Sequence, residues 1–193
     1  MNAAEQDVLD RVNANNWALL YRCRWSKADA ELVVPELSKL LESENTEITQ
    51  EALRALFRIG TPAVLATSQV AALARSPEPM TRQLAVQTLG QIAHKNPSLC
   101  VEPLASALND PLCCRDALRA LAFIGSEANS ALDRVKPLFS DSDAKVRKAA
   151  IVTAAAINIS DSEVFDLIRH ALVDRSKVVR EAADRCLHSA KSG

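Results

Sequence analysis

Apolar residues recur along the chain in blocks that are separated by a nearly constant step. The first block places apolar residues at Ala52, Leu56 and Ile59. Equivalent blocks begin at Ala52, Ala85, Ala117, Ala150 and Ala183. The steps between them are therefore 33, 32, 33 and 33 residues. A period of about 20 to 50 residues is typical of stacked-repeat proteins, in which each unit buries its apolar face against its neighbours. The pattern predicts a repeat protein with a period of about 33 residues.

Each period is predicted to contain two helices, of which the second is the better marked. From Val146 the apolar positions follow i, i+4, i+7, i+8 and i+11, which is one face of a helix. Polar runs such as SDSD at 140–143 supply N-cap oxygens in front of it. Gly60, Gly125 and Asn158 tolerate the left-handed conformation of a C-cap, so we expect second helices to end there.

The preceding helix of each pair contains proline in three units. Because proline is tolerated in a first turn or at a kink, we expect Pro35 and Pro103 near helix starts and Pro137 at a bend. The fold class predicted is all-α: a right-handed α-solenoid of about six antiparallel helix pairs in a single domain, 1–193. The predicted units are a capping pair at 1–28 and repeats at 29–60, 61–94, 95–125, 126–158 and 159–190.

Four segments carry a resemblance to a known family. They are SDSDAKVRKAAIVTAAAIN (140–158), VDRSKVVREAADRCLHSA (173–190), ALRALFRIGTPA (52–63) and ALRALAFIGSEA (117–128). They resemble HEAT repeats of the armadillo-like α-solenoid class, in particular the short variety also seen in the phycobilisome-lyase-like group. The TPLHxA signature of ankyrin units is absent, and the aromatic positions of tetratricopeptide units are not filled. The resemblance spans about residues 29–190 and speaks for architecture rather than activity.

The resemblance also implies a structural ladder between successive units. In HEAT families an Asp in the turn between the two helices and an Arg early in the second helix tie neighbouring units together. Asp141 with Arg147 and Asp174 with Arg180 match those positions, each pair six residues apart. Nearer the N-terminus the Arg position is filled by Thr49 in one unit and by Cys114 in another. Arg82 fills it in the unit between them, but without a matching Asp. The ladder is thus expected in the C-terminal units.

Composition and charge narrow the class of partner. Hydrophobic residues make up 48% of the chain and the net charge is −1, so a folded protein without a global positive field is expected. No apolar run is long enough to span a membrane, and the polar start does not look like a targeting segment. Five cysteines without CxxC spacing argue against a disulfide framework and a zinc site. We expect a cytoplasmic protein without a membrane partner.

The solvent-facing side of the second helices, which lines the concave surface in such solenoids, has an unusual composition. Phe123, Val152 and Ala156 cluster there in neighbouring units, where polar residues are normal. An apolar patch with an arginine rim is the composition of a protein-binding site. The alternative is that the patch lies under the next helix. The candidate partner-binding residues are Arg54, Arg58, Arg119, Phe123, Val152, Ala156 and Arg185.

A second cluster lies near the N-terminus. Trp17, Tyr21 and Trp25 have i, i+4 and i+8 spacing, and they include every Trp and Tyr of the chain. Such a stripe could stack bases or bind a peptide. Large aromatic residues also cap the core at the end of a solenoid, which is the role we favour.

The search for chemistry finds no catalytic, cofactor-binding or metal-binding constellation. Asp166 and His170 have i, i+4 spacing, but no third ligand or nucleophile accompanies them. Asp116 is placed to pair with Arg119 at i, i+3 rather than to act as the catalytic Asp of HEAT-like DNA glycosylases. The four glycines form no phosphate-binding loop.

The sequence therefore favours a non-catalytic protein–protein interaction scaffold or adaptor that binds a protein or peptide on its concave face and needs no cofactor. One alternative is a nucleic-acid-binding protein that uses the groove arginines, of which Arg54, Arg119 and Arg185 share one slot. A second alternative is a bilin lyase or lyase subunit, which the phycobilisome-lyase-like resemblance alone suggests.

Overall fold

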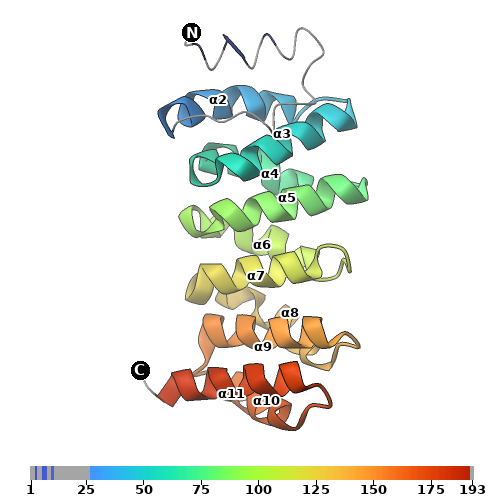
Figure 1. Cartoon of the computed structure of the whole chain (residues 1–193), viewed down its shortest axis with the longest axis vertical. Helices are drawn as coiled ribbons and strands as arrows, with labels where there is room; N and C mark the ends of the chain where they lie inside the picture. Colours follow the sequence, from blue (N-terminus) through green and yellow to red (C-terminus); the bar gives the residue numbers. More distant parts are fainter. Residues whose placement is uncertain (1–2, 4–5, 8–9, 11–26, 192–193) are drawn as a thin grey trace. The chain divides into compact units, whose positions relative to one another are not determined.

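Helices account for every regular element in residues 3, 6, 7, 10 and 27–191, which are the residues that the computed structural model describes (Figure 1). The predicted capping pair over 1–28, with Trp17, Tyr21 and Trp25, lies almost wholly outside the described residues. The chain divides into two compact units, Met1–Pro103 (unit 1) and Leu104–Gly193 (unit 2). The two are described separately here.

Unit 1 is built from helices that alternate between a first and a second element of a pair. Second helix α3 packs against second helix α5, while α2 packs against α3 and against a short 3-10 helix, η2. Helix α4 in turn packs against α5. The elements are α2 (Lys27–Leu40), α3 (Thr46–Ile59), η2 (Thr61–Ala66), α4 (Thr67–Leu73), α5 (Pro79–Ile92), η3 (Ala93–Lys95) and the start of α6 (Pro97–Ala107).

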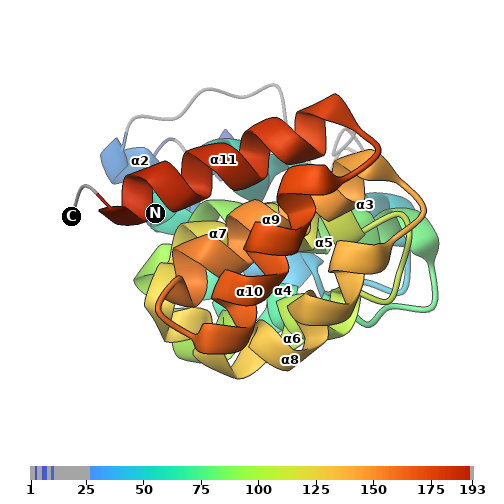
Figure 2. The ribbon, with the colours of Figure 1, turned by 90° about the horizontal axis from the view of Figure 1, so that it is seen from below.

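Unit 2 continues the same alternation after the end of α6. Its elements are α7 (Cys114–Ile124), η4 (Gly125–Ala131), α8 (Leu132–Val135), η5 (Lys136–Ser140), α9 (Ala144–Asn158), α10 (Ser162–His170), η6 (Ala171–Val173) and α11 (Lys177–Lys191). The second helices lie side by side, because α9 packs against α7 and also against α11 (Figure 1). Figure 2 shows the unit from the side of its last pair, α10 and α11. One face of α7, α9 and α11 is thus shared by three consecutive repeats.

The helix starts follow from the polar runs in the sequence. The side chains of Asn45 and Asp143 accept a hydrogen bond from the backbone N–H two residues on, at 2.9 and 2.8 Å. Glu78 and Asp161 accept from the N–H three residues on, at the start of α5 and α10. Each carboxylate or amide satisfies a donor that the first helical turn leaves without a partner.

The helix ends agree with the sequence prediction at two glycines. Gly60 and Gly125 end α3 and α7 with φ of 70° and 73°, a backbone conformation that a residue with a Cβ adopts only with strain. Helix α9 also ends where the sequence predicted, since Asn158 is its last helical residue, but Asn158 is not a left-handed C-cap. The C-cap residue of α9 is Ile159, which has right-handed dihedral angles, unlike the two glycines.

The proline predictions are correct at one position of three. Pro137 lies at the start of η5, where α8 gives way to a 3-10 helix. Pro35 and Pro103 instead lie inside α2 and α6. Pro35 is exposed, so the carbonyl that loses its N–H partner one turn earlier can bond to water, and the helix continues.

The core of each unit is formed by the apolar residues that recur about every 33 residues in the sequence. Leu56 and Leu89 in unit 1 and Leu121 and Ala154 in unit 2 are fully buried. The residue directly after each block's first alanine is also buried in four repeats, which the sequence analysis did not predict. These residues are Leu53, Val86, Leu118 and Ile151.

Two buried threonines connect neighbouring second helices. Thr88 donates a hydrogen bond to the carbonyl oxygen of Leu53 at 3.2 Å in unit 1. Thr153 donates to the carbonyl oxygen of Leu118 at 2.9 Å in unit 2. Both hydroxyls also contact the carbonyl four residues earlier in their own helix. The two threonines are 65 residues apart, as are Gly60 and Gly125, so each of these two features recurs after two repeats.

Candidate functional site

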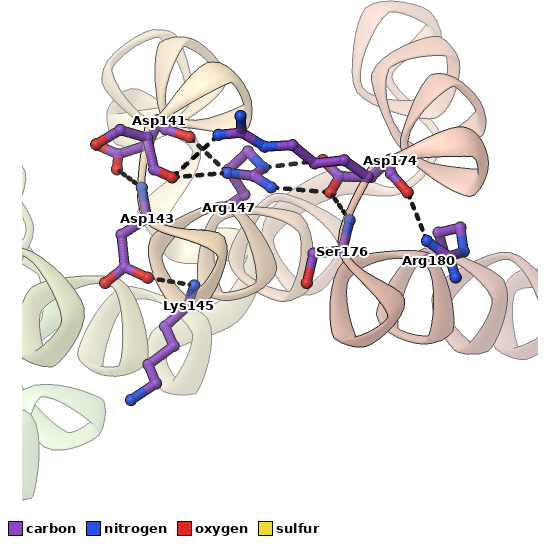
Figure 3. A network of polar contacts seen from close by, with 9 residues as sticks. Asp141, Asp143, Lys145, Arg147, Asp174, Ser176 and Arg180 are labelled. Carbon is purple, nitrogen blue, oxygen red and sulfur yellow. Dashed lines mark hydrogen bonds and ion pairs between the residues drawn. The ribbon is translucent and has the colours of Figure 1, made fainter.

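The Asp and Arg positions of the expected ladder meet at the start of α9 and α11 (Figure 3). The Arg147 guanidinium donates from Nε and Nη2 to the two carboxylate oxygens of Asp174, both at 2.8 Å. Its Nη1 donates to the carbonyl oxygens of Asp141 and Ser142 at 2.7 and 3.1 Å. Arg147 therefore bridges its own turn to the turn of the next repeat.

The six-residue pairs themselves are joined through the backbone. Arg147 and Arg180 each reach the main-chain carbonyl, not the carboxylate, of Asp141 and Asp174. The carboxylates of Asp141 and Asp174 each accept a hydrogen bond from the backbone N–H two residues on, which shapes the turn. Arg82 in unit 1 contacts the carbonyls of the equivalent turn in the same way, without the Asp. The ladder is thus a structural device.

Arg147 and Asp174 form an ion pair that is largely buried. The side chains are only 5% and 14% exposed. The hydrogen bonds from Arg147, helped by the N–H of Ser176, hold the pKa of the Asp174 carboxyl below its usual range. The same bonds raise the pKa of Arg147. Both groups stay charged, and the pair stabilises the junction between two repeats.

The exposed side of α7, α9 and α11, here named the α7–α9–α11 face, holds most of the candidate partner-binding residues. Phe123 on α7 is 62% exposed and Val152 on α9 is 40% exposed. Ala156 on α9, Arg119 on α7 and Arg185 on α11 are exposed as well. The apolar side chains are therefore at the surface and are not covered by a neighbouring helix of the unit.

The α7–α9–α11 face is hollowed by two depressions that share Val152. The larger has a volume of about 560 Å³ and the smaller about 460 Å³. Residues of α7, α9 and the start of α11 line the larger depression: Arg115, Arg119, Ala122, Lys145, Lys148, Ala149, Val152, Thr153 and Val178. The smaller lies between α9 and α11 and is lined by Val152, Ala155, Ala156, Ile159, Ala182, Arg185, Cys186, Ser189 and Ala190. Four of the seven candidates therefore line one depression or the other.

The remaining candidates lie elsewhere. Phe123 is on the last turn of α7, and it is not among the lining residues. Arg54 and Arg58 are on α3 in unit 1. Arg54 is held at 2.6 Å by Glu51, and Arg58 is exposed. Of the predicted arginine row, Arg54 and Arg58 thus belong to unit 1, and Arg119 and Arg185 belong to unit 2.

The larger depression has an uneven distribution of charge. All four of its charged lining residues are basic: Arg115, Arg119, Lys145 and Lys148. Arg119 is paired with the Asp116 carboxylate at 2.7 Å, as the i, i+3 spacing predicts. Its floor consists of aliphatic side chains from α7, α9 and α11. The result is an apolar depression with a basic rim.

Lys145 and Val178 are among the lining residues that the sequence analysis did not predict. Lys145 and Val178 each lie five residues before the first alanine of their block. At about 100° per residue this position lies at about 220° around the helix axis from the first alanine of the block. It is therefore on the solvent-facing side that holds the candidate residues. This position was not predicted to face solvent beside the candidates, because it precedes the apolar block by more than one helical turn.

The described residues offer no constellation for catalysis. They contain no group of three or more His, Cys, Asp or Glu side chains that could hold a metal ion. Burial raises the pKa of the Cys100 thiol to about 11 and that of Cys186 above its usual value, so neither is an activated nucleophile. His170 contacts the backbone oxygen of Asp166, whose carboxylate lies 3.9 Å from Arg169. Across the described part of the chain, none of the helices is suited in length and apolarity to cross a membrane.

Comparison with known proteins finds a family match over part of the chain. Residues 68–151 match the family model for HEAT repeats. An engineered protein of known crystal structure is 23% identical with a TM-score of 0.73, covering 100% of this chain and 98% of its own. No curated protein matches the sequence.

Two further solved structures are designed armadillo repeat proteins. One, in complex with the peptide (KR)4, is 18% identical with a TM-score of 0.74, covering 97% of this chain and 95% of its own. The other was computationally designed for modular peptide recognition and is 18% identical with a TM-score of 0.72, covering 91% and 92%. At these identities the likeness concerns the fold, and it confirms the predicted α-solenoid. The finer resemblance to phycobilisome-lyase-like repeats is not confirmed.

Proposed function

Since the chain is an α-solenoid whose residues 68–151 match the family model for HEAT repeats, we propose that it is a non-catalytic interaction scaffold that binds a protein or peptide on the α7–α9–α11 face. The observation that carries this proposal is the pair of adjoining depressions, which share Val152 and have aliphatic floors. Contiguous exposed apolar surface rimmed by polar groups marks interaction sites in soluble proteins. The volumes are in the range of about 300 to 1,000 Å³ that bound side chains and small ligands fill.

The absence of activated groups on this face supports binding rather than chemistry. The lining residues are aliphatic, basic or hydroxylic, and the thiol of Cys186 is disfavoured as a thiolate by burial. A designed armadillo protein of the same fold holds a peptide, which supports a peptide as the kind of partner. The cytoplasmic location expected from the composition is part of the same proposal.

Selection from a random peptide library displayed on phage tests the proposal directly. We expect the chain to enrich peptides that a Phe123→Asp, Val152→Asp variant does not retain, because two charges then stand on the apolar face. The matched control is Leu172→Asp, Val173→Asp, which places the same charges at two exposed apolar residues of η6 that line neither depression. Circular dichroism establishes that both variants fold. No enrichment, or equal retention by the first variant, would refute a peptide site on this face.

Nucleic-acid binding is the second candidate, because the rim of the larger depression is basic. Its mark is an affinity for duplex or single-stranded oligonucleotides that falls steeply with salt. Binding of oligonucleotides without any selected peptide would favour it over the scaffold. A bilin-lyase role rests on the sequence resemblance alone, and an absorbance change on adding a bilin is its test.

A further inference from the structure

The larger depression differs from its surroundings in the sign of its charge. Among the residues that the structure describes, Arg115, Lys145 and Lys148 have no ion-pair partner, although all three are exposed at its edge. Arg119 is the exception, paired with Asp116. In Figure 3 the Lys145 side chain extends away from the Asp–Arg network. A chain whose net charge is −1 thus gathers three uncompensated cations around one hollow.

The position of the lysines adds a second argument. Helix α9 begins at Ala144 and has no acidic residue in its first turn, where Lys145 stands, and Lys148 follows shortly after. The amino end of a helix carries a partial positive charge, so lysines there oppose the helix dipole. The two carboxylates at this helix end, those of Asp141 and Asp143, accept the backbone N–H groups of Asp143 and Lys145. The lysines therefore do not serve the stability of α9, and together with the helix end they favour an anion.

On this basis we propose that the α7–α9–α11 face selects an acidic peptide, with carboxylates at the basic rim and apolar side chains in the two depressions that share Val152. This inference rests on the proposed function and adds the chemistry of the partner to it. Complementary charge at a rim sets specificity and the rate of encounter, while the desolvated apolar anchors supply most of the affinity.

The proposal predicts an order of affinities among three matched peptides. They share a central Leu-Phe-Leu and carry either Glu, Gln or Lys at all flanking positions. Each rim contact is worth a small factor, so the three uncompensated cations together give about tenfold tighter binding of the Glu peptide than of the Gln peptide. The Lys peptide binds most weakly. Fluorescence anisotropy with labelled peptides at low salt measures the three constants, and the preference shrinks as salt is raised.

Charge reversal on the rim provides the decisive variant. We expect Lys145→Glu, Lys148→Glu to invert the order, so that the Lys peptide binds better than the Glu peptide. The change places an acidic residue in the first turn of α9, which the helix dipole favours, so the variant should fold at least as well. The control is Arg75→Glu, Lys95→Glu, two exposed residues of unit 1 with the same change in net charge. It should leave the order unchanged.

The outcomes separate this inference from the proposed function. Equal binding of the Glu, Gln and Lys peptides would leave a peptide-binding face and overturn its selectivity for acid. Failure of all three, together with failure of the phage selection, would overturn both. A Glu peptide whose Leu-Phe-Leu is replaced by Ser residues tests the anchors, and undiminished binding of it would show a polyanion site instead. So would a single-stranded oligonucleotide that displaces the Glu peptide and itself loses affinity in Lys145→Glu, Lys148→Glu.

Discussion

Removing the carboxylate of Asp174 should loosen the last repeat selectively, because it leaves the buried Arg147 guanidinium without its counter-charge. The two side chains are 14% and 5% exposed and share two hydrogen bonds of 2.8 Å. They join α9 to the turn before α11, so the pair belongs to the interface between two consecutive repeats. In a repeat array, stability is approximately the sum of such interface terms and the intrinsic stability of each unit.

The expected loss of stability follows from the contacts that the Asp174 side chain makes. Breaking a buried pair by removing one partner costs about 3 to 5 kcal/mol. Asp174→Ala also removes the acceptor of the Ser176 N–H at 2.7 Å, which is worth about 1 kcal/mol. Arg147 keeps its two bonds to backbone carbonyls, which lessens the loss. We therefore expect Asp174→Ala to cost about 4 kcal/mol, and the coupling energy with Arg147→Met to be about 2 to 3 kcal/mol.

A double-mutant cycle measured by urea unfolding, followed by circular dichroism, yields this coupling energy. The control cycle is Asp116→Ala with Arg119→Ala, a pair at 2.7 Å in which the arginine is 76% exposed. Its coupling should be about 0.5 kcal/mol or less, because water screens it. Hydrogen exchange locates the change, which should appear first in the amides of α11. Equal coupling energies in the two cycles would refute the argument from burial.

The same pair predicts the direction of a pH effect. The pKa of Asp174 is lowered in the folded state by the bonds from Arg147, so its contribution is fully present above the unfolded value of about 3.9. It is lost as the pH falls through the folded pKa. The stability difference between the wild type and Asp174→Ala should therefore be constant near neutral pH and shrink in acid. A difference that persists unchanged at about pH 2 would contradict this account.

Three further predictions concern the scaffold. Thr153→Val removes a buried hydroxyl whose one proton is shared between the carbonyl oxygens of Leu118 and Ala149, and it should cost about 1 to 2 kcal/mol in urea unfolding; a loss near zero would contradict this. Gly125→Ala and Gly60→Ala should each cost about 1 kcal/mol. The cause is φ alone, since the added Cβ at Gly125 meets the Ala156 oxygen at an ordinary 3.7 Å and that at Gly60 meets nothing within 4 Å. Unequal costs would point to sterics. Cys100, with its pKa raised to about 11, should resist thiol reagents at pH 8 until unfolding, and its contribution to stability should decline as the pH rises above the unfolded value of about 8.5.

The repeat architecture could be predicted because it depends on a periodic property. Burial of Ala52, Leu56 and their equivalents follows from apolar residues on one helix face, and that signal recurs in every unit. The buried face of each second helix is wider than the sequence analysis expected, so the buried Leu53 and Leu118, directly after the first alanine of their blocks, were not predicted. A helix packed between two neighbouring helices buries a wider face than an isolated pair does.

Local rules performed less well where tertiary packing competes with them. Proline disfavours a helix interior, but Pro35 stands on the exposed side of α2, and the buried Val34 and Leu37 hold the helix together. The resemblance to HEAT repeats predicted a ladder between successive units, but it did not predict which atoms of the Asp and Arg residues make it. The arginine fork of Arg147 binds the Asp174 carboxylate of the next repeat, while its contact within its own repeat is with the Asp141 backbone. Sequence spacing alone cannot show which of two equivalent Asp residues an Arg reaches.

The position of the candidate site follows from where the sequence departs from what the scaffold requires. In the second helices of unit 1 the solvent-facing slots hold polar residues such as Arg58 and Gln91, as the stability and solubility of a helix demand. The same slots in unit 2 hold Phe123 and Ala156, two apolar side chains that are exposed instead of being part of the core. Lys145 likewise stands where the dipole of α9 disfavours it. Residues that an α-solenoid does not need, gathered around two adjoining depressions, are best explained by a partner that covers them.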